Sequence, residues 1–424
     1  MNRNDAALGE AVVRMLCAGR FGEAYEHFGT SLRALLSLEN LTAAWHREIG
    51  PEATPGAAEV RDGVVAVPVP DREATVLLSV VRGKLGGLRI VHDVALWQPP
   101  HYADAAAFDE EEIDLATAAG PVPGTVSVPR RGATPRPAVV LLGGGGPFDR
   151  DGTAGANKTM KDIAWGLATG GVIVLRFDKP SHLEAARGGN WAEIPPTADY
   201  VPPAVAAVRA LRARADVDPR RIFVLGHSMG GRYAPRVAVA EPTIAGLILL
   251  SADTQPMQRA AVRVARYLMT VAPESARAML PDPEELLAQA ERVERADLSE
   301  STPAGELPLG LAAGTWLDLR EYDPVATAIT VRKPMFIAQG GRDYQVTVVD
   351  DLAGWDRGLG DRDDVDIRVY ESDDHMFFTG SGTSRPSDYA APQHVDGAVV
   401  ADIAVWMTAV TEAEPDAEAV GGRS

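Results

Sequence analysis

A serine set between glycines constrains the fold of this chain most. Residues 226–231 read Gly-His-Ser-Met-Gly-Gly and fit the pattern G-x-S-x-G. The pattern directly follows the apolar stretch 221–225, a predicted strand, and precedes a predicted helix. Such a sharp turn strains the serine backbone, and only glycine fits where side chains at 226 and 230 would collide with the neighbouring strand and helix. The pattern therefore predicts that Ser228 is an exposed nucleophile; the alternative is a structural serine in a turn.

Strands and helices alternate on both sides of this motif. Predicted helices cover 203–214 and 399–407, and the predicted strands are near-continuous apolar runs at 137–142, 171–177, 221–225, 245–250, 334–338 and 367–370. Strands of this kind belong to a parallel sheet that is covered by helices on both faces. We expect an α/β domain over residues 108–410.

One long segment interrupts the alternation. Residues 253–330 show only helical periodicity, for example at Val264, Leu268 and Val271. A helical insert between two strands of a sheet is a candidate lid over the site. An additional packing layer without a gating role is the alternative.

The flanking regions differ in character. Residues 1–95 combine two helical patterns, near 11–16 and 32–45, with strands at 64–69, 75–81 and 88–91, the last two joined by a hairpin turn at 82–84. We expect a small α+β domain there, with covering the pocket, dimerisation and substrate binding all open as its role. Residues 96–107 are predicted to be a linker, and 411–424 a disordered tail without an apolar face.

The composition narrows the classes of partner. A formal net charge of −18 disfavours nucleic acid and anionic membranes. Cys17 is the only cysteine, so no internal disulfide can form. No apolar run is long enough to span a bilayer, and the N-terminal residues lack a signal-peptide pattern. We expect a soluble, cytoplasmic protein without a metal or organic cofactor, and a homodimer is compatible with the sequence.

A serine nucleophile needs a base and an acid. In folds that carry this motif the chain order is serine, acid, histidine. His375 follows the strand 367–370, where the base is expected, and His394 is its rival. Asp343 follows the strand 334–338 and is the expected acid. The other candidate acids are Asp253, then Asp350 and Asp351, which are expected to begin a helix instead.

A glycine loop supplies the remaining requirement, an oxyanion hole. One N–H donor is expected from Met229, the residue after the nucleophile. The other is expected from the loop 143–147, which reads Gly-Gly-Gly-Gly-Pro, at Gly145 or else at Gly144. Gly144 and Gly146 are further expected to line the substrate site. A phosphate-binding loop is disfavoured because no Gly-Lys-Ser/Thr ending follows.

These motifs together resemble a known family. Residues 143–151, GGGGPFDRD, are similar to the G-S-G-P-x-D-R-D loop of dienelactone-hydrolase-like and prolyl-oligopeptidase-like α/β-hydrolases. The resemblance continues through 175–179, 226–231, 340–346, 374–377, 387–389 and Trp406, and covers roughly residues 108–410. Residues 10–95 resemble a small domain of unknown function that often precedes such hydrolases.

The resemblance implies an α/β-hydrolase fold with the triad Ser228, Asp343 and His375. It also implies an oxyanion hole from Met229 and Gly145. By the same resemblance, Asp149 and Arg150 brace the glycine loop and do not react.

This chain departs from the family pattern in its loops. It has glycine at 143 and 145, where the family usually has histidine and serine, so a more flexible loop is expected. It also has Asp-Lys-Pro at 178–180 where the family has Asp-Lys-Arg, so a contact near the site should differ.

The expected reaction is acyl transfer through an acyl-serine. Water is the expected acceptor, and a small-molecule carboxylic ester or thioester is the expected substrate. A cyclase, thioesterase or acyltransferase of secondary metabolism is the alternative, followed by a non-catalytic binding protein on a hydrolase scaffold.

Overall fold

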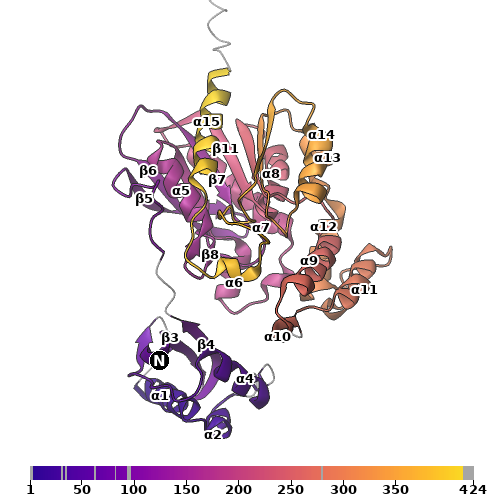
Figure 1. Cartoon of the computed structure of the whole chain (residues 1–424). Coiled ribbons are helices and arrows are strands. Elements are labelled where there is room, and N and C mark those ends of the chain that lie inside the picture. Colours follow the sequence, from indigo (N-terminus) through magenta and orange to yellow (C-terminus); the bar gives the residue numbers. More distant parts are fainter. Residues whose placement is uncertain are drawn as a thin grey trace, which may run out of the picture. The chain divides into compact units, whose positions relative to one another are not determined.

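The computed structural model describes residues 3–29, 32–33, 36–61, 64–81, 83–92, 97–277 and 280–413. The chain divides into two compact units, residues 1–96 and 97–424, each with its own core (Figure 1).

The first unit joins helices to an antiparallel sheet, as predicted. Its helices are α1 (Arg3–Cys17), α2 (Phe21–Glu26) and α4 (Leu38–Glu48), with a 3-10 turn η1 (Pro70–Arg72). Its strands are β1 (Glu59–Arg61), β2 (Val64–Val69), β3 (Ala74–Val81) and β4 (Lys84–His92), in the order β1-β2-β3-β4. The predicted hairpin joins β3 to β4, with Val81 opposite Lys84, although Arg82 lies outside the described residues.

The helices and strands of this small unit pack together through their apolar faces. Helix α1 buries Val12, Val13 and Leu16, three positions on one side of a helix. Alternate residues of β2 and β3 meet them in a single cluster, including Val65 and Leu78. The unit therefore has a core of its own.

The second unit is built on an eight-stranded sheet. The strands are β5 (Phe108–Thr117), β6 (Gly120–Pro129), β7 (Arg136–Leu142), β10 (Ile173–Phe177), β11 (Val217–His227), β12 (Gly246–Leu250), β13 (Met335–Gly340) and β14 (Val365–Tyr370). Their order is β14-β13-β12-β11-β7-β10-β6-β5. The six strands from β14 to β10 run parallel, whereas β6 pairs antiparallel with both β10 and β5. A two-stranded ribbon of β8 (Thr153–Ala154) and β9 (Asn157–Lys158) follows the glycine loop.

Helices cover both faces of this sheet, as predicted (Figure 1). Helices α5 (Thr159–Thr169) and α15 (Gly397–Ala413) pack on one face. Helices α7 (Pro196–Arg212), α8 (Met229–Ala240) and α14 (Ala353–Leu359) pack on the other. Successive residues of the buried strands point to opposite faces of the sheet. Val139 packs in the apolar cluster with α5 and α15, and Val140 packs in the cluster with α7, α8 and α14. This arrangement is the α/β-hydrolase fold that the sequence implied.

Between β12 and β13 the chain is helical, as expected for residues 253–330. The helices are α9 (Met257–Val271), α10 (Glu274–Arg277), α11 (Pro283–Glu294), α12 (Ala313–Glu321) and α13 (Pro324–Thr330), with 3-10 turns η3 (Ala304–Glu306) and η4 (Pro308–Gly310). Helices α9 and α11 share a small apolar cluster, which includes Val262 and Ala290. The remaining short elements are α6 (Pro180–Ala186), η2 (Trp191–Glu193), the π-helical turn η5 (Val348–Leu352) and η6 (Pro386–Tyr389).

The predicted linker and the predicted tail lie at the two ends of the second unit. Residues 97–107, assigned to a linker from the sequence, contact this unit: Trp97 donates a 2.7 Å hydrogen bond to Asp162, and Tyr102 a 2.8 Å bond to the Val395 carbonyl. Residues 411–413 belong to the end of α15, and residues 414–424, the remainder of the predicted tail, lie outside the described residues.

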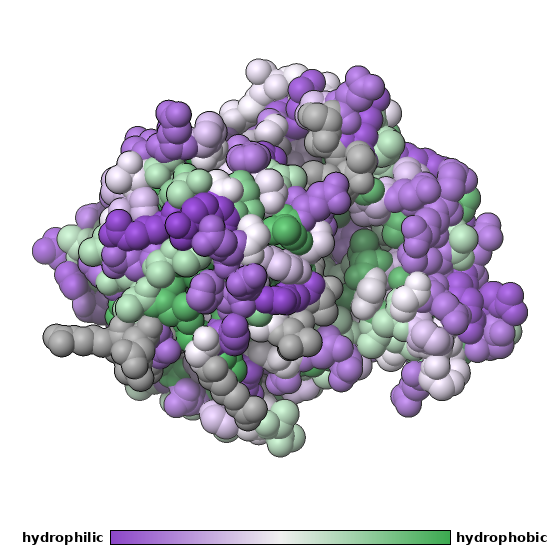
Figure 2. All heavy atoms as spheres, turned by 90° about the horizontal axis from the view of Figure 1, so that it is seen from below, coloured by the Kyte–Doolittle hydropathy of each residue, from purple (hydrophilic) through white to green (hydrophobic). Residues whose placement is uncertain are grey.

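Hydrophilic side chains dominate the face drawn in Figure 2, with smaller apolar areas between them. Among the described residues, no helix has the length and apolar character needed to cross a membrane.

Candidate active site

Ser228 occupies the turn between β11 and α8. Its backbone has φ 54° and ψ −123°, in a region that residues with a side chain rarely adopt. A Cβ at Gly226 would overlap the backbone of Gly230, and one at Gly230 would overlap the carbonyl of Leu142. Both positions therefore require glycine, and the turn presents Ser228 at the carboxyl end of β11.

Three predicted site residues form a hydrogen-bonded chain. The Nε2 of His375 lies 3.1 Å from the Oγ of Ser228. The Nδ1 of His375 lies 2.7 Å from the Oδ2 of Asp343. The side chains of His375 and Asp343 are 5% and 0% exposed, so water does not compete for this contact. The structure thus brings together residues that lie 147 and 32 positions apart in the sequence.

Hydrogen bonds fix the Asp343 carboxylate. Its Oδ1 accepts from the backbone N–H groups of Gln345 and Val346, at 2.8 and 2.9 Å. Its Oδ2 accepts from Nε2 of Gln339, at 3.0 Å, as well as facing His375. With both oxygens held, the carboxylate keeps one orientation toward the imidazole.

The electrostatics of His375 suit a general base. Burial alone would lower its pKa, but the adjacent Asp343 carboxylate, together with the charges of Asp374 and Asp253, raises the pKa above the ordinary value. The carboxylate also selects the tautomer with the proton on Nδ1, which leaves Nε2 free to accept from the Ser228 hydroxyl.

The rival residues are engaged elsewhere. The Nδ1 of His394 lies 3.2 Å from Asp162, on the α5 side of the sheet. Asp253 forms a 2.9 Å ion pair with Arg232. Asp350 and Asp351 lie in the π-helical turn η5, whose N-cap is Thr347, in line with the expectation that they begin a helix.

The glycine loop lies against the nucleophile. A Cβ at Gly144 would be 3.6 Å from the Cβ of Ser228, and one at Gly145 would be 3.6 Å from the Cβ of Met229. Gly146 has φ 91°, a conformation that favours glycine. Arg150, just beyond the loop, binds Asp178 through two side-chain nitrogens at 2.8 and 3.2 Å.

His227 makes a contact that the sequence analysis did not predict. Its Nε2 lies 2.8 Å from the carbonyl oxygen of His375. Burial lowers the pKa of His227 to about 4, so the ring is neutral at neutral pH and donates its Nε2 proton to that carbonyl. No sequence signal pointed to this bond, because the two residues meet only in the folded sheet.

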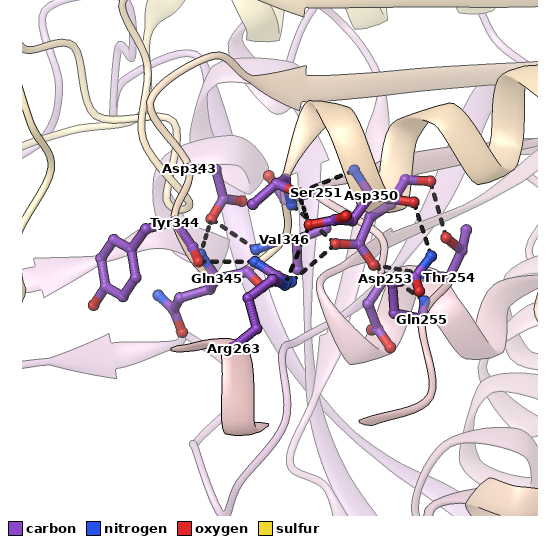
Figure 3. Close-up of polar contacts among 12 residues, drawn as sticks. Ser251, Asp253, Thr254, Gln255, Arg263, Asp343, Tyr344, Gln345, Val346 and Asp350 are labelled. Atoms are coloured by element: carbon purple, nitrogen blue, oxygen red, sulfur yellow. Dashed lines mark hydrogen bonds and ion pairs between the residues drawn. The ribbon is translucent and has the colours of Figure 1, made fainter. Parts of the chain in front are cut away.

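Helix α9 is fastened to the loop that carries Asp343. Arg263 of α9 donates to the carbonyls of Tyr344 and Gln345, at 3.2 and 2.9 Å (Figure 3). Its Nη2 also lies 3.2 Å from the buried Asp351 carboxylate. Helix α9 of the helical insert therefore contacts the loop that carries the triad residue Asp343.

A cavity of about 420 Å³ adjoins the Asp343 side of this constellation. It is lined by α9, by the loop after β13 and by the loop after His375, at Arg263, Tyr267, residues 341–344, Thr347 and residues 382–384. The rings of Tyr267 and Tyr344 stack at 4.9 Å on its wall. Among the described residues, no group of three or more His, Cys, Asp or Glu side chains is placed to hold a metal ion.

Comparisons with known proteins found similarity to hydrolases. Residues 151–379 match the family model described as serine aminopeptidase, S33. Esterase EstD of Thermotoga maritima is 32% identical over 411 residues, 93% of this chain and 93% of EstD. Among solved structures, Est1E from Butyrivibrio proteoclasticus matches with a TM-score of 0.45 and 14% identity, over 71% of this chain and 99% of Est1E. Brefeldin A esterase, a bacterial homologue of human hormone sensitive lipase, matches with a TM-score of 0.46 and 16% identity, over 76% of this chain and 82% of its own.

Proposed function

The chain belongs to the hydrolase family described as serine aminopeptidase, S33, and on that premise we propose that it is a serine carboxylesterase acting on small-molecule esters. The observation that carries the proposal is the hydrogen-bonded chain from Ser228 through His375 to Asp343, at the end of a strand in a strained turn. The 32% identity to an esterase over nearly the whole length supports an ester over an amide as substrate.

The first half of the reaction forms an acyl-enzyme. The Oγ of Ser228 attacks the ester carbonyl carbon while Nε2 of His375 takes the hydroxyl proton. Asp343 holds the imidazole and stabilises the imidazolium. The tetrahedral intermediate then collapses: the bond to the alcohol oxygen breaks, and the alcohol leaves with the proton from His375.

The second half releases the acid. A water molecule gives a proton to His375 and attacks the acyl-serine. The resulting tetrahedral intermediate then collapses: its bond to the Oγ of Ser228 breaks, His375 returns the proton to that oxygen, and the carboxylic acid departs. Each half restores the charge state of the triad, so no cofactor enters the balance.

The oxyanion of both intermediates needs two N–H donors. We assign these to Met229 and Gly145, with Gly144 and Gly146 lining the substrate site. Within the part of the chain that the structure describes, neither the Met229 nor the Gly145 N–H donates a hydrogen bond to another protein group. Met229 follows Ser228 in the chain and Gly145 lies against Met229, so the free donors and the nucleophile occur together.

The first test compares the full chain with Ser228→Ala on p-nitrophenyl esters of graded acyl length. We expect turnover by the wild type and none above background in the variant. His375→Ala should abolish turnover equally, while His394→Ala, which alters the rival histidine, should retain it. Mass spectrometry with a fluorophosphonate should show one adduct, on Ser228.

The same assay distinguishes neighbouring activities. Amino-acid p-nitroanilides test aminopeptidase action, and p-nitrophenyl thioesters test thioester hydrolysis. Faster Ser228-dependent cleavage of the anilides than of the esters would replace the esterase assignment. An acyl adduct that accumulates without turnover would indicate an acceptor other than water, and turnover that survives Ser228→Ala would overturn the mechanism.

A further inference from the structure

Lys179 is a buried lysine that lies two residues after the end of β10. It was not among the site residues predicted from the sequence. Its side chain is only 4% exposed, and burial lowers its pKa. An ammonium group has three protons to donate. In the fold these meet the carbonyls of Gly144 and Gly146, at 2.7 and 2.6 Å, and the hydroxyl of Tyr200, at 3.2 Å.

A second buried group binds the same loop. The hydroxyl of Tyr200, in α7, donates a 2.7 Å hydrogen bond to the Gly144 carbonyl. The Lys179 ammonium lies 4.9 Å from the centre of the Tyr200 ring and 3.6 Å from Asp199, which supplies the countercharge. The Gly144 carbonyl therefore accepts two hydrogen bonds from groups that are shielded from water.

These contacts determine where the next N–H points. Gly144 and Gly145 share a trans peptide, in which the C=O and the N–H point in opposite directions. When the Gly144 oxygen is bound to Lys179 and Tyr200, the Gly145 N–H is directed away from them. The loop also lies against the nucleophile: a Cβ at Gly144 would be 3.6 Å from the Cβ of Ser228, and one at Gly145 would be 3.6 Å from the Cβ of Met229.

The loop needs such a restraint. Residues 143–146 are four consecutive glycines, which have the greatest backbone freedom of any residue type. An oxyanion donor helps catalysis only when it is already oriented before charge develops. A positive charge bound to the carbonyl end also polarises the peptide, so its N–H becomes a stronger donor in this dry environment.

We propose that Lys179 and Tyr200 are positioning residues that orient the Gly145 N–H for the oxyanion; the proposal rests on the esterase function proposed above. Neither touches the reacting atoms. Replacing either residue should lower kcat, because the oriented N–H is needed when negative charge develops on the carbonyl oxygen. It should change KM less, because the ester is still neutral when it binds.

The test uses Tyr200→Phe, Lys179→Met and the matched control Tyr233→Phe. Tyr233 is buried and stacks on Tyr200 at 5.5 Å, but its hydroxyl binds Asp318 instead of the loop. On a p-nitrophenyl ester we expect kcat to fall by about tenfold in Tyr200→Phe and about a hundredfold in Lys179→Met, with KM within about twofold, since losing one oxyanion donor outright costs about 10²–10³. Tyr233→Phe should keep the wild-type kcat.

A boronic acid that forms a tetrahedral anion on serine reads the oxyanion hole directly. Its inhibition constant should rise across the variants in proportion to the loss of kcat/KM. Equal kinetics and boronate affinity in Tyr200→Phe and Tyr233→Phe would overturn the proposal, even if Lys179→Met failed to fold. A rise in KM alone would also overturn it, because that would indicate a role in substrate binding. Wild-type turnover that persists in Ser228→Ala would instead defeat the esterase proposal itself, and the positioning role with it.

Discussion

The Nε2 of His227 lies 2.8 Å from the carbonyl oxygen of His375, so the residue before the nucleophile holds the backbone of the proposed base. The two imidazole rings are also adjacent, with centres 4.9 Å apart. The same turn of the chain therefore carries Ser228, the proposed nucleophile, and His227, which hydrogen-bonds to the backbone of the proposed base.

This hydrogen bond predicts that His227→Phe lowers the catalytic rate. The ring volume is kept, but the donor to the His375 carbonyl is lost, so the base should lose part of its orientation. We expect kcat/KM to fall by about tenfold, corresponding to about 1.4 kcal/mol of transition-state stabilisation. Ester hydrolysis measures this, with the exposed His101→Phe as the control. Equal rates in the two variants would mean that the bond does not contribute.

The pH profile should report the pairing of His375 with Asp343. Only neutral His375 accepts the serine proton, so kcat/KM should fall as the pH drops through the pKa of this residue, which the carboxylate raises above its ordinary value. In Asp343→Asn the raising charge is gone while burial remains, so the acid limb should move to lower pH. The rate at neutral pH should fall by about 10⁴-fold, the effect known for loss of a triad acid. An unchanged limb in an active Asp343→Asn variant would contradict the pairing.

Asp373 predicts a pH dependence of stability. Burial, together with the nearby Asp396 and Asp374, raises its pKa from 3.8 to about 7. The folded state then binds this proton more tightly than the unfolded state does. Its stabilising contribution is complete below the unfolded pKa and is lost as the pH rises through about 7.

Asp373→Asn should remove this loss. At pH 8 we expect the variant to be more stable than the wild type by on the order of 2 kcal/mol, with the difference vanishing near pH 4. Chemical denaturation at several pH values measures it, with the exposed Asp361→Asn as the control. A constant difference between variant and wild type across this range would show that Asp373 does not titrate in the fold.

The contacts of Asp351, beside the site, predict that its substitution lowers the stability of the fold. Its buried carboxylate accepts from the backbone N–H groups of Thr254, Gln255 and Thr347 and pairs with Arg263. Asp351→Asn replaces one acceptor oxygen by a donor facing these N–H groups and leaves Arg263 without its buried countercharge. The free energy of unfolding should fall by about 2–4 kcal/mol.

The neighbouring Asp350→Asn is the matched control, because that carboxylate is 41% exposed. Denaturant unfolding should separate the two variants, and amide exchange should increase at Thr254 and Thr347 only in Asp351→Asn. Equal stability of the two variants would contradict a fastening role for Asp351.

The sequence by itself determined the features that depend on local pattern. The strand, the glycines and Ser228 are contiguous, so the strained turn could be predicted from steric requirements alone. The buried parallel strands were equally visible, because both of their faces are apolar. Asp343 and His375 could be proposed because each follows a strand, and parallel strands end at one edge of the sheet.

Only the tertiary structure decided the rest. Strands β5 and β6 escaped prediction because one carries a run of acidic residues and the other has proline and glycine in place of a clear alternation. The hydrogen bonds of His227 to His375, of Lys179 to Gly144 and of Asp351 to Thr254 join residues 148, 35 and 97 positions apart. A charge or an imidazole in the sequence shows what it can bind, but its partner depends on which loops the sheet brings together. The physical reason is that long-range hydrogen bonds form only after the apolar strands and helices have packed, and packing is a property of the whole chain.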